Sequence, residues 1–128
     1  IKRKMKHESA IIKKRYSVEG MLSIIKCFDM CIGMRLHTLI YAAINSVPLI
    51  GLVYDPKINS FMEYTHQRHY VDVNEVTDEN LKKMLDECVA NYDTIKQDLK
   101  ENYSHLKEKA KLNGKYAIEL YEKGSVTL

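Results

Sequence analysis

The residues best suited to chemistry in this chain are four charged or protonatable side chains at the ends of its most hydrophobic segments. Arg35 and His37 follow one apolar stretch, and Asp55 and Lys57 follow the next. An arginine binds a carboxylate or phosphate through paired hydrogen bonds, and a lysine adds a compact positive charge. A histidine donates or accepts a proton near neutral pH. These residue types predict a site for a small anion.

Neighbouring strands of a parallel sheet would bring these four residues together. The apolar segments 28–34 and 47–54 are typical of buried strands, and 35–46 is typical of a helix packed on several sides. Ligands of open parallel sheets bind beyond the carboxyl ends of the strands, and adjacent strands lie about 4.8 Å apart. Gly33 would let the backbone approach the anion, and the first amides of the helix would add donors.

The rest of the pattern continues the alternation of helices and strands and predicts an α/β fold with a parallel sheet. Asn45-Ser46 is expected to end the central helix. The other expected elements are a helix capped by Ser17, a short helix beginning near Asp55-Pro56, a strand at 70–73, and a helix capped by Thr77 or Asp78. A long amphipathic helix is expected from Asp93. It should end or kink at Asn113-Gly114, after which a helical segment resumes.

Charge is unevenly distributed along the 128 residues, which carry +3 overall. Residues 1–15 hold seven basic side chains against Glu8, so the remainder of the chain is acidic. A basic arm suits nucleic acid or anionic lipid, but a solvated helix face or the edge of a neighbouring domain is the favoured interpretation. No aromatic residues are interleaved with the charge, and no nucleic-acid partner is expected. No stretch reaches the ~20 apolar residues of a membrane span.

The three cysteines, Cys27, Cys31 and Cys88, are odd in number and lack CxxC spacing. This pattern argues against a disulfide framework and against a closed zinc site. Cys27 and Cys31 lie among apolar residues, so we expect buried, reduced thiols, which favours the cytoplasm. No metal ligands are evident, and no metal is expected.

One continuous stretch carries a family resemblance. The sequence from residue 32 to 61 reads IGMRLHTLIYAAINSVPLIGLVYDPKINSF. It resembles the C-terminal signature of the polysaccharide pyruvyl transferase family, in particular its CsaB-type cell-wall members. That signature is an apolar strand, Met-Arg-Leu-His, a small-residue helix, Val-Pro, a second apolar strand, then Tyr-Asp-Pro-Lys and a Phe. The resemblance is strong over residues 17–64 and looser along the helical tail.

The resemblance implies a Rossmann-like parallel sheet flanked by helices, forming the C-terminal half of a GT-B-like two-domain enzyme. On this interpretation the chain is a single domain, 1–128, whose N-terminal partner domain is missing from the sequence. It divides into a basic leading segment (1–16), an α/β core that contains the motifs (17–73) and a helical tail (77–123). Half of a cleft is not expected to turn over substrate by itself.

The resemblance also implies the reaction, transfer of a pyruvyl group from phosphoenolpyruvate to a sugar as a cyclic ketal. No cofactor is expected, because phosphoenolpyruvate is itself the donor substrate. In the CsaB-type branch the acceptor is N-acetylmannosamine of a lipid-linked cell-wall saccharide, and the finished secondary cell-wall polymer anchors surface-layer proteins. The implied location is the cytoplasm, with peripheral association at the inner face of the membrane through the acceptor.

Carried over position by position, Arg35, His37 and Lys57 are the implied catalytic residues around phosphoenolpyruvate. Gly33, Tyr54 and Asp55 complete the expected substrate-binding set. His37 is either the general acid or a phosphate ligand, and the sequence leaves both roles open. Asp55 is a candidate base toward a sugar hydroxyl, although a helix-capping role is favoured. For Tyr54, a ring in the core is the safer interpretation.

Two other functions fit parts of the pattern. A nucleotide-sugar glycosyltransferase of GT-B type would share the architecture, with Asp55 or Glu63 placed for a donor ribose. A non-catalytic interaction module would use the amphipathic segment 93–112 to dock a partner. For that segment, packing over the sheet or onto the missing domain is the favoured interpretation.

Overall fold

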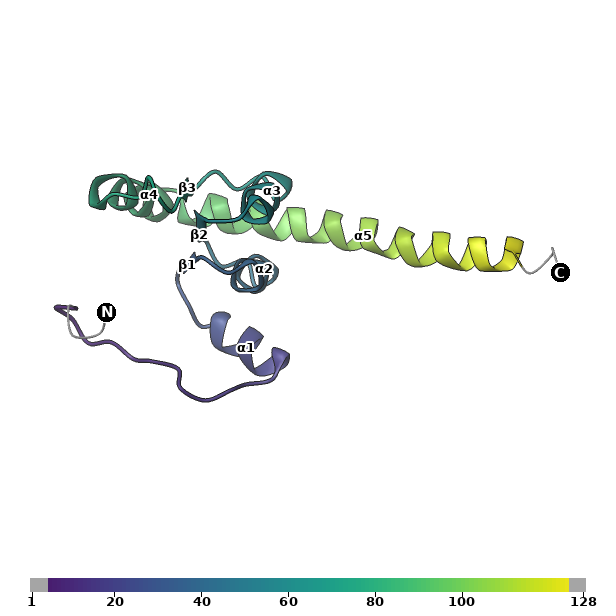
Figure 1. The fold of residues 1–128 in the computed structure, drawn as a ribbon, viewed down its shortest axis with the longest axis horizontal. Coiled ribbons are helices and arrows are strands. Elements are labelled where there is room, and N and C mark those ends of the chain that lie inside the picture. The colour runs from purple at the N-terminus through teal and green to yellow at the C-terminus, as the bar shows by residue number, and fades with distance from the viewer. Residues whose placement is uncertain (1–4, 125–128) are drawn as a thin grey trace.

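The computed structural model describes residues 5–124 and shows a three-stranded parallel sheet flanked by helices, with a long C-terminal helix projecting from it (Figure 1). The predicted α/β class is therefore confirmed. The strands are β1 (Cys31–Gly33), β2 (Leu49–Val53) and β3 (Tyr70–Asp72), in the order β1-β2-β3. The helices are α1 (Val18–Ile25), α2 (Leu36–Ile44), α3 (Pro56–Tyr64), α4 (Asp78–Ala90) and α5 (Tyr92–Gly124).

Helices α2 and α3 cover one face of the sheet, with α4 on the other side (Figure 1). Gly33 and Gly51 are register partners in β1 and β2. A Cβ on Gly33 would meet Leu39 of α2, and one on Gly51 would meet Met62 of α3, so both helices lie over the same face. The core between the layers consists mainly of fully buried aliphatic side chains, including Leu39, Leu49, Ile50, Ile58 and Met62.

Side-chain caps fix the starts of three helices where the sequence predicts them. The Ser17 hydroxyl accepts from the amide of Gly20 (3.2 Å), and Asp55 Oδ1 accepts from the amide of Lys57 (2.9 Å). Thr77 caps α4 through a reciprocal capping box with Asn80. Each cap satisfies an amide that would otherwise lack a partner in the first helical turn. The end of α2 at Asn45 and the strand near 70–73 are also confirmed.

The predicted buried strand over 28–34 is too long and too enclosed. Only residues 31–33 form β1, and Ile32 and Met34 are each 44% exposed. β1 is an edge strand, and within residues 5–124 helix α2 packs on the face that carries Gly33 while the face of Ile32 is left open. Apolar residues on both faces of a strand predict that both faces are buried. In β1, however, the described helices cover one face only.

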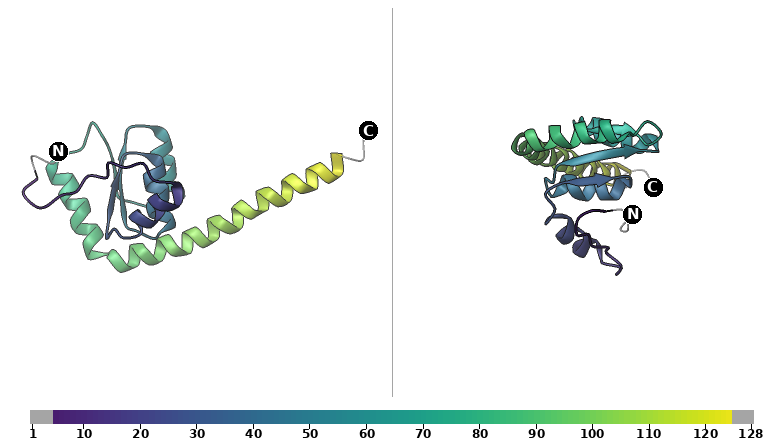
Figure 2. Two further views of the ribbon diagram at one scale, coloured as in Figure 1. Left: turned by 90° about the horizontal axis from the view of Figure 1, so that it is seen from below. Right: turned by 90° about the vertical axis from the view of Figure 1, so that its left-hand side faces the viewer.

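Helix α5 runs without interruption through Asn113-Gly114, so the predicted end of the helix there is wrong. A helical glycine costs only about 1 kcal/mol relative to alanine, which neighbouring helical residues tolerate. The first turns of α5 pack on α2 and α4 and bury Ile95 and Leu99. Beyond them the helix extends away from the body of the domain, as Figure 1 and the left view of Figure 2 show.

The cysteines are free thiols in the part of the chain that the structure describes, but Cys27 is exposed rather than buried as predicted. It follows the last turn of α1, where its Sγ donates to the carbonyl of Ser23 (3.4 Å). Cys31 and Cys88 are buried, and burial raises the pKa of both thiols, that of Cys88 to about 11 with help from the charge of Glu87.

No helix within residues 5–124 combines the length and the hydropathy that crossing a bilayer requires. Of the basic leading segment, Lys2, Arg3 and Lys4 lie outside the described residues.

Candidate active site

The two halves of the motif meet at the carboxyl ends of β1 and β2. Gly33 pairs with Gly51 in register, so Arg35 and Tyr54 follow the strand ends at nearly the same level. Arg35 Nη1 lies 3.5 Å from the Tyr54 hydroxyl, and its guanidinium carbon lies 5.9 Å from the centre of the Tyr54 ring. Tyr54 is 47% exposed, so its interpretation as a core ring is wrong. Its ring instead supports the arginine across the strand ends.

The N-terminus of α2 is left without a side-chain cap. Arg35 occupies the N-cap position, and its carbonyl accepts from the amides of Thr38 and Leu39, but its side chain makes no capping bond. Within residues 5–124, the amides of Leu36 and His37 have no hydrogen-bond acceptor. Two free amides at the positive end of a helix, beside an arginine, form an arrangement that attracts anions.

Asp55 and Lys57 form the second half of the site. Asp55 caps α3, which confirms the favoured interpretation of that residue. Its second carboxylate oxygen lies 3.9 Å from Lys57 Nζ, and the lysine side chain is 76% exposed. An exposed pair at that distance is weak, because solvent and salt screen it. The ammonium of Lys57 therefore remains available to an incoming anion.

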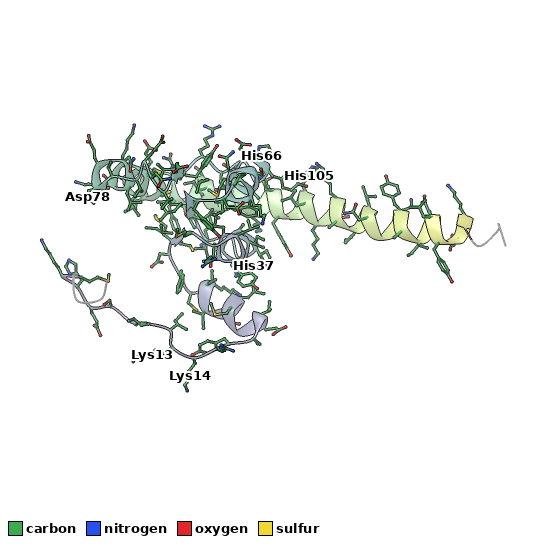
Figure 3. All side chains as sticks on the ribbon, viewed as in Figure 1. Lys13, Lys14, His37, His66, Asp78 and His105 are labelled. Atoms are coloured by element: carbon green, nitrogen blue, oxygen red, sulfur yellow. The ribbon has the colours of Figure 1, made fainter. Side chains whose placement is uncertain are left out.

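His37 lies exposed on the first turn of α2 (Figure 3). Its ring packs edge-on against Tyr41, one turn further along the helix, with the ring centroids 6.3 Å apart. Among the described residues, this ring contact is the interaction that involves its side chain. The structure therefore brings Arg35 to Tyr54 and Lys57 to Asp55, while the convergence of Arg35, His37 and Lys57 on one guest stays a prediction.

Gly33 has a packing role that the sequence did not reveal. A Cβ at this position would lie 2.5 Å from Leu39 Cδ2 and 3.0 Å from Leu39 Cγ. The absence of a side chain lets α2 approach β1 closely, which in turn places Arg35 at the strand end. A direct contact of Gly33 with substrate stays a prediction.

Two cavities in the described part of the chain lie away from these residues. The larger, of about 720 Å³, is formed by the loop before β3 together with α4 and α5. The smaller, of about 110 Å³, lies between α5 and the last turns of α2 and α3. Neither of these two cavities is lined by the six predicted residues. Within residues 5–124, no group of three or more His, Cys, Asp or Glu side chains is arranged to hold a metal ion.

Comparison with known proteins supports the family resemblance. Residues 1–56 match the model of the family described as polysaccharide pyruvyl transferase. Over this segment the chain is similar to that family of transferases, which confirms the resemblance seen in the sequence. The match includes Arg35, His37, Tyr54 and Asp55, and it ends before Lys57. No curated protein and no solved structure matches the chain.

Proposed function

We propose that this chain forms the donor side of a polysaccharide pyruvyl transferase of the CsaB type, which binds phosphoenolpyruvate and transfers its pyruvyl group to a cell-wall sugar. The observation that carries the proposal is the contact between Arg35 and Tyr54 at the carboxyl ends of β1 and β2. It joins the two motif halves at the edge of the sheet where parallel α/β domains bind ligands.

Phosphoenolpyruvate carries a carboxylate and a phosphate, and the site offers a partner for each. The guanidinium of Arg35 matches a planar carboxylate or a phosphate in bidentate geometry. The free amides of Leu36 and His37 supply neutral donors at the same helix end. Lys57 would exchange its weak pair with Asp55 for the more highly charged phosphate.

The reaction adds two sugar hydroxyls to the enol carbon. A proton is added to the methylene carbon, one hydroxyl oxygen bonds to the adjacent carbon, phosphate leaves with its electron pair, and the second hydroxyl closes the ring. One hydroxyl proton ends on the new methyl group and the other is carried away with phosphate. In this proposal His37 either delivers the first proton or binds the departing phosphate. Asp55 acts as the cap of α3 rather than as the base.

The acceptor in this proposal is N-acetylmannosamine on a lipid-linked precursor of secondary cell-wall polymer, whose pyruvylated form anchors surface-layer proteins. The enzyme would work in the cytoplasm at the inner face of the membrane. Its cleft would be completed by an N-terminal domain in a GT-B-like arrangement. No metal, cofactor or nucleic acid enters the proposal.

The test uses a full-length enzyme that contains this chain, titrated with phosphoenolpyruvate and with a UDP-sugar. We expect Arg35→Ala and Lys57→Ala each to weaken phosphoenolpyruvate binding about tenfold or more, since each removes a charge-assisted contact. Lys57→Arg should retain more binding than Lys57→Ala, and Lys82→Ala, an exposed lysine on α4, should change nothing.

Tighter binding of the UDP-sugar than of phosphoenolpyruvate would refute the proposal in favour of a glycosyltransferase. Unchanged pyruvylation after replacement of Arg35, His37 and Lys57 would remove the catalytic role of the motif and favour an interaction module.

A further inference from the structure

The larger cavity lies at the opposite end of the sheet from the candidate active site. Its lining begins with residues 66–69, which immediately precede β3, and continues along the last turns of α4 and the first turns of α5. Because the strands are parallel, this is the amino end of the sheet, whereas Arg35 and Tyr54 follow the carboxyl ends. A volume of about 720 Å³ falls within the usual range for small-molecule sites.

The walls of this cavity carry opposite charges. The loop before β3 contributes His66, Arg68 and His69. The facing helices contribute carboxylates from Glu87, Asp98 and Glu101. The lining also includes the apolar side chains of Met84 and Ile95 and the neutral polar side chains of Asn91, Thr94 and Asn102.

Two of the charged groups are free of protein partners. Within residues 5–124, neither the guanidinium of Arg68 nor the carboxylate of Asp98 makes a hydrogen bond or ion pair. Apart from His66, the other ionisable groups of the lining have protein partners within residues 5–124. His69 Nε2 lies 3.5 Å from a Glu87 carboxylate oxygen, and Gln97 donates to Glu101 (2.6 Å). The cavity therefore presents the guanidinium of Arg68 and the carboxylate of Asp98 as groups without protein partners.

The loop that carries the basic wall is held firmly by hydrogen bonds from buried or half-buried groups. Thr65 and Gln67 are only 3% and 6% exposed, and Gln67 Nε2 donates to the Thr65 carbonyl (3.1 Å). Asn102 of α5 donates to the same carbonyl at 2.7 Å. The second of these bonds ties one wall to the other, so the cavity is formed before any ligand enters, which lowers the entropic cost of binding.

We propose that this cavity is a second binding site, for a phosphorylated amino sugar or a closely similar small zwitterion. Arg68 would bind the phosphate and Asp98 the ammonium group, since these are the available opposite charges. Asn91 and Thr94 also line the cavity, with groups that hydrogen-bond sugar hydroxyls. The carboxylates disfavour a purely anionic ligand, and Arg68 disfavours a purely cationic one.

The test is a titration followed by ¹H–¹⁵N NMR with three probes that differ by one group. Glucosamine 6-phosphate carries both charges, glucose 6-phosphate lacks the amine, and glucosamine lacks the phosphate. We expect glucosamine 6-phosphate to bind at least about tenfold more tightly than either of the others, as the loss of one charge-assisted contact predicts. The shifts should fall on the amides of 66–69 and 91–102.

Two variants locate the effect. Arg68→Gln should remove most of the difference in affinity between glucosamine 6-phosphate and glucosamine. Asp98→Asn should remove most of the difference in affinity between glucosamine 6-phosphate and glucose 6-phosphate. The matched controls are Lys82→Gln and Asp86→Asn, two exposed residues of α4 outside the lining, which should bind as the parent does. All four changes are at exposed positions, and far-UV circular dichroism verifies that the fold is unchanged.

Three results would overturn this proposal: absent shifts, equal affinity for the three probes, or shifts confined to residues around Arg35 and Tyr54. The last would assign phosphate binding to the candidate active site instead. Binding at the amino end is independent of phosphoenolpyruvate binding at the carboxyl end, so either proposal can fail while the other stands.

Discussion

Replacing Gly33 by alanine tests how the strand positions the helix that carries the motif. The new Cβ would lie 2.5 Å from Leu39 Cδ2 and 3.0 Å from Leu39 Cγ. Leu39 has no exposed surface, so its side chain has no solvent to move into. Overpacking of this kind lowers the free energy of unfolding by about 1 to 3 kcal/mol.

The chain offers a matched control in Gly114→Ala. Gly114 lies inside helix α5, and a Cβ there would meet no heavy atom within 4 Å. Alanine should therefore raise the stability of the helix by about 0.5 to 1 kcal/mol, because a glycine loses more backbone entropy on folding. The same substitution is thus expected to act in opposite directions at the two sites.

Thermal unfolding followed by circular dichroism measures both effects. For a domain of this size, 1 kcal/mol corresponds to a shift of about 3 to 6 °C in Tm. Adding Leu39→Val to Gly33→Ala removes the methyl group that clashes, so the double variant should lose less than the sum of the single losses. Unchanged stability of Gly33→Ala would refute the packing argument. Weaker phosphoenolpyruvate binding with unchanged stability would instead support the substrate contact predicted from the sequence.

Three further predictions follow from other features of the fold. Arg35→Ser, which restores an N-cap to α2, should raise the free energy of unfolding by about 1 kcal/mol in a denaturation experiment while weakening phosphoenolpyruvate binding in the full-length enzyme. Iodoacetamide at pH 8 should modify exposed Cys27 much faster than buried Cys88, as measured by peptide mapping. Because the pKa of Cys88 is raised from 9.0 to about 11, the stability that its buried neutral thiol contributes is present below pH 9 and is lost as the pH rises toward 11. Leu99→Ala should lower the free energy of unfolding by about 2 to 5 kcal/mol in chemical denaturation, because Leu99 is fully buried. Ending the chain after residue 111 should leave the denaturation midpoint nearly unchanged, because residues 112–124 are mainly exposed.

Local signals in the sequence predict the elements of this fold well. Ser17, Asp55 and Thr77 are short polar residues before amphipathic segments, and each does cap the helix that follows. Segments rich in β-branched residues alternate with helical segments. This alternation predicts parallel strands, because the connection between two parallel strands usually contains a helix. These features depend on residues close in the chain.

Burial on a particular face is predicted less well, because it depends on what lies across the sheet. The apolar residues of 28–34 resemble those of 47–54, yet β2 is central and β1 is an edge. Ile50 is completely buried while its register partner Ile32 is 44% exposed. The burial of Cys27 was mispredicted for the same reason, because apolar neighbours in the sequence do not place a side chain against the core.

The larger cavity was beyond prediction for a different reason. Arg68 and Asp98 belong to a loop and a helix separated by a strand and another helix, and no spacing rule connects them. What joins them is the turn between α4 and α5, which brings the second helix back across the amino end of the sheet. By contrast, Arg35 and Tyr54 could be paired in advance, because consecutive parallel strands end at the same edge.

The contrast between α2 and the other capped helices connects stability to the proposed chemistry. Ser17, Asp55 and Thr77 satisfy amides at the starts of α1, α3 and α4, whereas Arg35 leaves those of α2 free. A serine at that position would satisfy one of them and would stabilise the domain by about 1 kcal/mol. It would also remove the guanidinium and close the amides to a ligand. A chain under selection for stability alone has no reason to keep an arginine there, whereas a chain that binds an anion at this helix end gains both the free donors and the positive charge.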